Sequence, residues 1–138
     1  MTPSHRTILK PTSVAPPAGK YSHAAQVDGG KLLFVAGQIA TDTNGNLVGA
    51  GDAGAQTRQV FENLGAVLKN AGASFDDVVE FTYYIVGRSS VQQFLDARTA
   101  IFDEAYPDGD FPPATLLIVD GLVREDLLLE VSAVAALP

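Results

Sequence analysis

The stretch Leu127-Leu-Leu-Glu-Val-Ser-Ala-Val-Ala135 decides the fold, because it predicts a β-strand with apolar residues on both faces. One face carries only apolar side chains, those of Leu129, Val131, Ala133 and Ala135. The other face carries a carboxylate, Glu130, in the company of Leu128, Ser132 and Val134. Both faces of such a strand need cover, so we expect helices on one face and other subunits against the second.

Two helices are predicted upstream of this strand. Asp52 can cap a helix whose apolar residues recur at helical spacing from Val60 to Ala71, before Gly72 ends it. Ser90 and Gln93 have the spacing of a capping box, and the helix that they begin would run up to Pro107. Further β-rich runs precede and follow this second helix, at Asp77–Val86 and Ala114–Val119.

The N-terminal part is predicted to contribute a hairpin. Ser22–Val27 and Lys31–Ile39 are β-rich and flank Asp28-Gly-Gly30, a turn sequence that tolerates positive φ. Residues 1–20 are rich in proline and read as an extended arm, in which only Thr7–Leu9 could pair as a strand.

The resulting order ββ-α-β-α-ββ predicts an α/β (α+β) domain with a mixed six-stranded sheet. Right-handed crossovers would place both helices on one face of it. The 138 residues, 46% of them hydrophobic, suit one domain spanning residues 1–138.

Charge and composition exclude several classes of protein. Cysteine is absent, and neither of the two histidines has a partner at metal-ligand spacing, so we expect no metal and no thiolate chemistry. A net charge of −7 makes nucleic acid an unlikely partner. No apolar run approaches a membrane span, and Met1 to Ala18 lacks the order of a signal peptide, so a cytoplasmic protein is expected.

Glu130 is the residue that most strongly suggests chemistry, because an apolar strand tolerates an unpaired charge poorly. In one interpretation its carboxyl orients a water molecule or shuttles a proton. In the other it is satisfied by an arginine or by backbone N–H groups at a subunit interface. The residues alone leave both interpretations open.

Two further positions suggest ligand binding. Arg98 interrupts the apolar seam of the second helix, where it could bind an anion or could lie over the core with its head paired to Asp96, Asp103 or a neighbouring chain's acid. Gly37-Gln38 ends a β-rich run, where a glycine allows a ligand to approach the backbone closely.

Short motifs along nearly the whole chain resemble the reactive intermediate deaminase family, also called YjgF or Rid. They are Gly19-Lys-Tyr-Ser-His23, Leu33-Phe-Val-Ala-Gly-Gln-Ile39, Gly51-Asp52 with Gln56-Thr57, Asn63-Leu64, Ala71-Gly-Ala73, Asp77-Val-Val79, Pro113-Ala114 and Leu129-Glu-Val131. The resemblance implies a chorismate-mutase-like fold and a homotrimer with small-molecule sites in the clefts between subunits.

The resemblance also implies hydrolysis of small imines or enamines without a cofactor. By resemblance, Glu130 matches a glutamate that positions the attacking water, Tyr21 a tyrosine that lines the cleft, and Gly37 a backbone N–H donor to the substrate, with Gln38 beside it. Active members carry an arginine that binds the substrate carboxylate, where this chain has Thr115. Thr115 suits a neutral or hydroxylated ligand, unless Arg98 reaches the cleft and replaces the missing cation.

Two functions are therefore expected from the sequence. The first is a deaminase of altered substrate scope that acts through Glu130-directed water. The second is a non-catalytic trimer that binds a small molecule or a partner.

Overall fold

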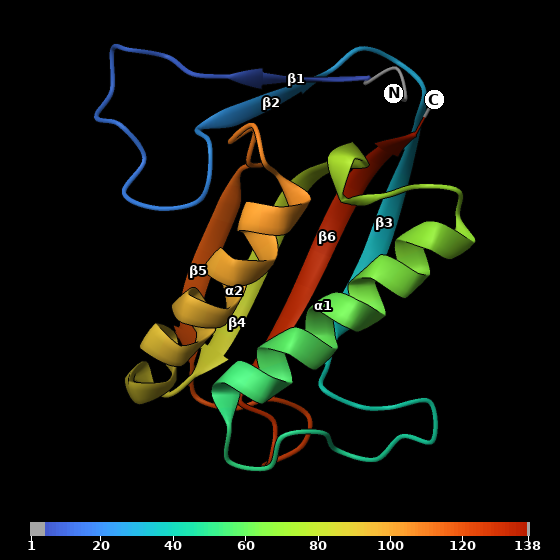
Figure 1. Ribbon diagram of the computed structural model, residues 1–138, viewed down its shortest axis with the longest axis vertical. Helices are drawn as coiled ribbons and strands as arrows, with labels where there is room; N and C mark the ends of the chain where they lie inside the picture. The colour runs from blue at the N-terminus through green and yellow to red at the C-terminus, as the bar shows by residue number, and fades with distance from the viewer. Residues whose placement is uncertain (1–4, 138) are drawn as a thin grey trace.

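The structure, a computed structural model that describes residues 5–137, consists of a sheet covered on one face by two helices (Figure 1). The main sheet has four strands in the order β3-β6-β4-β5. Its central strand β6 (Leu129–Leu137) pairs antiparallel with β3 (Lys31–Gln38) and with β4 (Val78–Val86). The edge strand β5 (Ala114–Val119) runs parallel to β4, so the predicted mixed sheet is confirmed.

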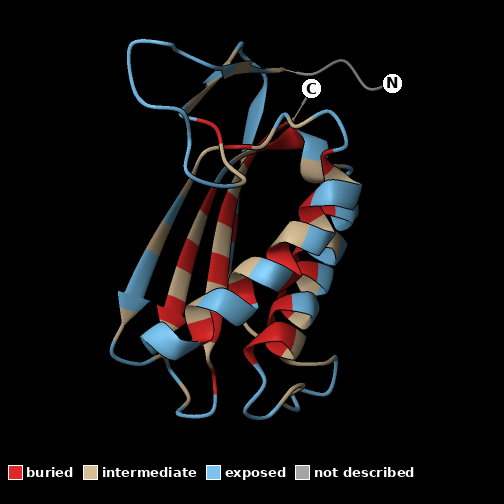
Figure 2. Ribbon diagram, turned by 60° about the vertical axis from the view of Figure 1, so that its left-hand side comes forward, coloured by how far each residue is buried: buried red, intermediate tan, exposed pale blue. Residues whose placement is uncertain are grey.

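The two predicted helices are confirmed and pack side by side on the same face of the sheet (Figure 2). Helix α1 (Ala53–Asn70) is capped by Asp52, whose Oδ1 accepts from Ala55 N at 3.0 Å. Gly72 follows its end with a φ of +76°, a conformation that glycine adopts without strain. Helix α2 (Val91–Ala105) connects the parallel strands β4 and β5. Neither helix within residues 5–137 has both the length and the apolarity that a membrane crossing requires.

The predicted hairpin and the six-stranded sheet are wrong in their pairing. Strand β2 (Ala24–Val27) pairs antiparallel with β1 (Arg6–Leu9), and these two form a separate ribbon across one end of the main sheet (Figure 1). The turn at Gly29 and Gly30 has the predicted positive φ values, but it directs β3 away from β2. The reason is burial: pairing with the nine-residue β6 puts Leu33 and Val35 of β3 against the core, which four-residue β2 could not achieve.

The predicted capping box at Ser90 is also wrong. A short 3₁₀ turn (Arg88–Ser90) precedes α2, and the Ser90 side chain makes no capping hydrogen bond. Gln93 instead turns to the neighbouring helix, where its Oε1 accepts from Ala53 N at 3.1 Å. It thus satisfies a free N–H at the start of α1 and ties the two helices together.

An aromatic cluster fills the space between the helices and the sheet. Phe61 of α1 packs edge-on against Phe102 of α2, with ring centroids 5.8 Å apart, and also against Phe81 of β4 at 5.7 Å. All three side chains are essentially inaccessible to solvent. The 3₁₀ turn Phe75–Asp77 closes this end of the core, because Phe75 also contacts the Phe61 ring. Burial of rings this large stabilises the two-layer arrangement.

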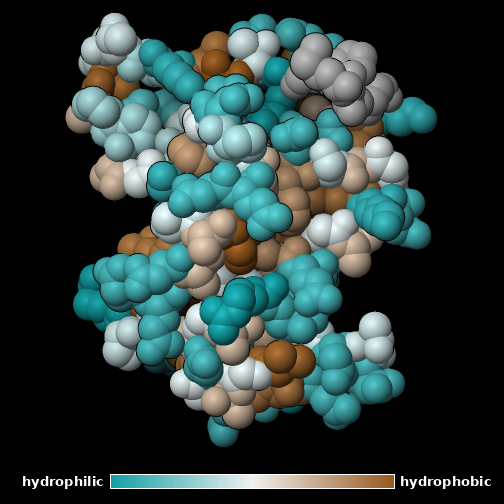
Figure 3. Space-filling view, in the orientation of Figure 1, coloured by the Kyte–Doolittle hydropathy of each residue, from teal (hydrophilic) through white to brown (hydrophobic). Residues whose placement is uncertain are grey.

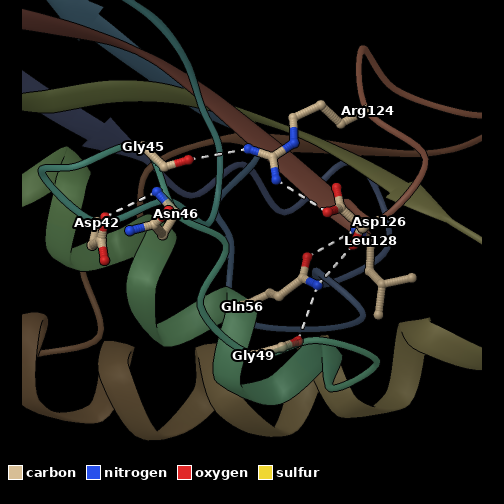
Figure 4. Close-up of polar contacts among 8 residues, drawn as sticks. All are labelled: Asp42, Gly45, Asn46, Gly49, Gln56, Arg124, Asp126 and Leu128. Carbon is tan, nitrogen blue, oxygen red and sulfur yellow. Dashed lines mark hydrogen bonds and ion pairs between the residues drawn. The ribbon is translucent and has the colours of Figure 1, made fainter.

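A buried glutamine fixes the segment that leads into β6 (Figure 4). Gln56 of α1 is fully buried, and its Oε1 accepts from Leu128 N at 2.8 Å. Its Nε2 donates to the carbonyl oxygens of Asp126 and Gly49, both at 3.1 Å. Arg124 ties the same segment to a neighbouring loop through Gly45 O. The start of β6, and with it Glu130, is therefore anchored to α1.

We predict that Gln56→Leu destabilises the fold by about 2–4 kcal/mol, because it removes three partly buried hydrogen bonds, those to Asp126 O, Gly49 O and Leu128 N, while nearly keeping the side-chain volume. Denaturant unfolding measures this difference. The matched control is Gln92→Leu on the exposed side of α2, where the loss of one bond to Asp96 costs under about 0.5 kcal/mol. Equal stability of the two variants would contradict the anchoring role of Gln56.

A candidate active site on the open face of the sheet

The face of the sheet opposite the helices is open and differs in character from the helix-covered side. The helix-covered side is predominantly hydrophilic, with hydrophobic residues visible only in separate patches (Figure 3). On the open face, β3 presents Leu32 and Phe34, which are 52% and 74% exposed, and β5 presents Leu117, which is 43% exposed. Apolar exposure on this scale is typical of an interface.

Glu130 lies on this open face. Its neighbours Leu129 and Val131 are buried beneath the helices, so alternation along β6 directs Glu130 to the other side. The cross-strand partner of Glu130 is Tyr84 of β4, and the next pair on the same face is Ser132 with Thr82. The carboxylate is half-buried and thus sits among a phenol and two hydroxyl side chains.

Gly37 makes room for the Glu130 side chain. The register between β3 and β6 shifts between Val35 and Gln38, which marks an irregularity in β3 beside Glu130. A methyl group at Gly37 would lie 2.8 Å from Glu130 Cγ and 2.6 Å from Glu130 Cδ. Only glycine leaves space for the carboxylate in its present position. The Gln38 side chain folds back over the irregularity, and its Nε2 donates to Ala36 O at 3.2 Å.

The Glu130 carboxylate has no ion-pair partner and accepts no hydrogen bond from any residue in the range 5–137. The two interpretations of Glu130, one in which it orients a water molecule or shuttles a proton and one in which partners at a subunit interface satisfy it, both stay predictions. Both oxygens remain available to a water molecule, a ligand or a neighbouring chain. Across the described chain, no group of three His, Cys, Asp or Glu residues could hold a metal ion.

Thr115 shares the face of Glu130 but not its immediate surroundings. It is exposed on β5 and pairs with Thr82 of β4, which leaves it two strands away from Glu130. Tyr21 and Arg98 lie elsewhere, and both line a cavity on the helix side of β5. The Tyr21 hydroxyl accepts from Ala18 N at 3.3 Å. One chain thus brings together Glu130, Gly37 and Gln38, and separately Tyr21 and Arg98.

The predicted pairing of Arg98 with Asp96 or Asp103 is wrong. Asp96 accepts from Gln92 at 2.8 Å, and Asp103 forms an ion pair with Lys20 at 3.4 Å. The Arg98 side chain does lie over the core, as one interpretation of the sequence expected, and it is 6% exposed.

The polar residues that surround Glu130 on β4, Thr82 and Tyr84, were not among the predicted site residues. Thr82 and Tyr84 alternate with the buried Phe81, Tyr83 and Ile85 along β4, which is the signal that could have placed them on the open face. Their pairing with β6 could not be read in the same way, because it is a contact between segments distant in the sequence.

We predict that Gly37→Ala displaces the Glu130 carboxylate by about 1 Å or more while changing the free energy of unfolding by less than about 1 kcal/mol. The reason is that the three atoms nearest to the added methyl group belong to the Glu130 side chain, which has several rotatable bonds, and not to backbone. A crystal structure and a thermal unfolding curve of the variant measure both effects. An unmoved carboxylate, or a collapse in stability, would contradict this geometry.

Known proteins are similar to this chain in sequence and in fold. The family described as Endoribonuclease L-PSP matches residues 12–137. A RutC family protein of Pyrococcus abyssi is 35% identical over 125 residues, which cover 90% of this chain and 92% of that protein. The 3-aminoacrylate deaminase RutC of Acinetobacter baylyi is 33% identical over 132 residues, which cover 94% of this chain and 97% of that protein.

A solved structure extends the match to three dimensions. YyfB from Yersinia pestis, described as a protein of unknown function of the conserved Rid protein family, is 36% identical and superposes with a TM-score of 0.86. The match covers 96% of this chain and 99% of that one. The chain therefore belongs to the Endoribonuclease L-PSP family, the YjgF/Rid family that its motifs resemble.

Proposed function

We propose that this protein hydrolyses small imines or enamines to a carbonyl compound and ammonia, without a cofactor, through a water molecule held by Glu130. The observation that carries the proposal is the half-buried Glu130 carboxylate, which is held over Gly37 and has no ion-pair or hydrogen-bond partner among residues 5–137. The relationship to a 3-aminoacrylate deaminase supports the same chemistry, because 3-aminoacrylate is itself an enamine.

The proposed reaction needs one water molecule and a group that accepts and returns a proton. An enamine first becomes an imine when its N–H proton moves to carbon. The water oxygen then bonds to the imine carbon while Glu130 takes a proton from that water and passes it to the nitrogen. The C=N double bond has by then become a single bond, with a hydroxyl and an amino group on the same carbon. The hydroxyl proton moves to the nitrogen through Glu130, the C–N bond breaks with its electron pair leaving in ammonia, and the oxygen electrons form the C=O bond. A carboxylate already placed beside the reacting carbon lowers the entropic cost of this addition.

The complete site is proposed to lie between the copies of a homotrimer. Tyr21 is on the helix side of its own chain, and Thr115 is two strands from Glu130. Their participation at Glu130 therefore requires that a neighbouring copy present them. The exposed Leu32, Phe34 and Leu117 on the open face support such an assembly, since they would be buried by it.

The charge of the chain disfavours an RNA substrate, despite the description of the family. The net charge of −7 repels a phosphate backbone, and the unpaired Glu130 adds to that repulsion at the site itself. A non-catalytic small-molecule-binding trimer is the second candidate function, favoured by Thr115 at the position where active relatives are expected to carry arginine.

We predict that Glu130→Gln lowers the rate of ammonia release from freshly generated imines by about 100-fold or more, because the amide cannot accept the water's proton. The measurement uses carboxylated and uncharged imines with purified protein. The matched control is Glu80→Gln, an exposed carboxylate of β4, which should keep the wild-type rate.

The outcomes separate the two candidate functions. Wild-type turnover by a folded Glu130→Gln variant would remove Glu130 from the reaction. Absence of turnover by the wild-type protein with every imine would instead favour the binding trimer. A preference for carboxylated imines over uncharged ones would indicate that another cation takes the place of the missing arginine.

A further inference from the structure

Three hydroxyl side chains form a row across the open face of the sheet beside Glu130. Ser132 of β6 pairs with Thr82 of β4, and Thr82 pairs with Thr115 of β5. Side chains paired in this way point to the same face, with Cβ atoms about 5 Å apart. We call Ser132, Thr82 and Thr115 the hydroxyl row. Its near end lies two residues along β6 from Glu130, a distance of about 7 Å.

The described part of the chain leaves these hydroxyls without partners. Thr82 and Ser132 are half-buried and Thr115 is exposed, and none of the three hydroxyls is hydrogen-bonded to another described residue. By contrast, the buried hydroxyl of Thr57 donates to Ala53 O at 2.7 Å. A hydroxyl group can donate one hydrogen bond and accept two, so the row offers several hydrogen bonds to whatever covers it.

The charges on this face oppose a negatively charged ligand. In the part of the chain that the structure describes, the open-face positions of β4, β5 and β6 hold no lysine or arginine. The charged side chains at these positions are carboxylates, Glu130 among them. Arg98 lines a cavity on the helix side of β5 and so lies across the sheet from them. A carboxylate on the ligand would therefore meet like charge, whereas an uncharged polar group would not.

We propose that the hydroxyl row recognises a substituent of the substrate, and that this substituent is an uncharged carbon chain with several hydroxyl groups. Hydroxyls on the two sides suit each other, since each can donate to one neighbour and accept from another. The substrate class that follows is the open-chain imine or enamine that ammonia or an amine forms with a sugar-like aldehyde. The proposal rests on the proposed hydrolysis, because it concerns the same site at Glu130.

The dimensions of the row set the reach that the substrate needs. Neighbouring strands lie about 4.8 Å apart, so the row extends about 10 Å from Ser132 to Thr115. With the reacting carbon beside Glu130, a short substituent reaches Ser132 and Thr82, and only a longer chain reaches Thr115. Thr115 then contacts the far end of the substrate, and not the reacting carbon.

The test compares three stable probes that share one carbon skeleton. D-Gluconamide carries the hydroxyl groups and an uncharged amide, which stands in for the C=N group. Hexanamide lacks the hydroxyl groups, and D-gluconate has a carboxylate in place of the amide. Calorimetry and ligand-observed NMR measure the affinity of each probe, and circular dichroism establishes that each variant is folded.

Three variants locate the bound probe. A triple variant with Ser132→Ala, Thr82→Val and Thr115→Val removes the hydroxyl row and keeps a β-branched side chain at both threonine positions. Thr7→Val removes an exposed hydroxyl from another strand, β1, and is the matched control. Glu130→Gln removes the negative charge beside the row and leaves the hydroxyls in place.

We expect the wild-type protein to bind gluconamide at least tenfold more tightly than hexanamide or gluconate. The triple variant should bind gluconamide at least tenfold more weakly, and Thr7→Val should bind it within twofold of the wild type. Glu130→Gln should tighten the binding of gluconate at least threefold, because it removes a like charge beside the ligand. Wild-type affinity for gluconamide in the folded triple variant, or tighter binding of gluconate than of gluconamide, would overturn the proposal.

Ammonia release separates this proposal from the proposed hydrolysis. If the protein releases ammonia from imines and its triple variant keeps the wild-type affinity for gluconamide, the role of the hydroxyl row is overturned and the hydrolysis stands. If gluconamide binding depends on the hydroxyl row but no imine is hydrolysed, the ligand class is supported and the hydrolysis is overturned.

Discussion

The structure depends on the alternation of side chains along β6, an inner strand that pairs with β3 on one edge and with β4 on the other. Its odd-numbered residues from Leu129 to Ala135 are buried beneath the helices, and its even-numbered residues face the opposite side. A shift of one residue would carry Glu130 into an aromatic core and expose the apolar set, so the register is strongly enforced. The same constraint that forms the core thereby holds a carboxylate on the open face.

Two features turn this placement into a defined geometry. Gln56 anchors the segment before β6 to α1 through two hydrogen bonds, to Asp126 O and Leu128 N, and its third bond, to Gly49 O, holds the preceding loop, so the strand enters the sheet in one position. Gly37 then leaves the space that the Glu130 carboxylate occupies. Gln56 acts through hydrogen bonds from its side chain to the backbone, and Gly37 acts through the absence of a side chain. Together they hold the Glu130 carboxylate in one position on a regular strand, where no described residue pairs with it. The proposed catalytic role requires this kind of fixed placement.

The elements predicted correctly from the sequence are those whose signal is local. Helix α1 was predicted from the spacing of its apolar residues between Asp52 and Gly72, and β4 and β6 from their β-branched and aromatic content. The hairpin failed because the turn at Gly29 and Gly30 is a local signal, whereas the partner of β3 is chosen by burial against distant β6. The predicted capping box of Ser90 and Gln93 is wrong for a similar reason, since Gln93 accepts its hydrogen bond from Ala53 at the start of the other helix. The surroundings of Arg98 and the fit of Glu130 over Gly37 arise only when distant segments meet.

The central claim is that the position of the Glu130 carboxylate, and not its presence alone, enables hydrolysis. The most direct measurement is the kcat/KM of Gly37→Ala for an imine that the wild-type protein hydrolyses, because the variant keeps the carboxylate and the backbone N–H. A loss of about 100-fold or more in a protein of unchanged thermal stability is the result expected when a catalytic group is misplaced by about 1 Å. A kcat/KM within about threefold of the wild type, with the carboxylate displaced, would contradict the account.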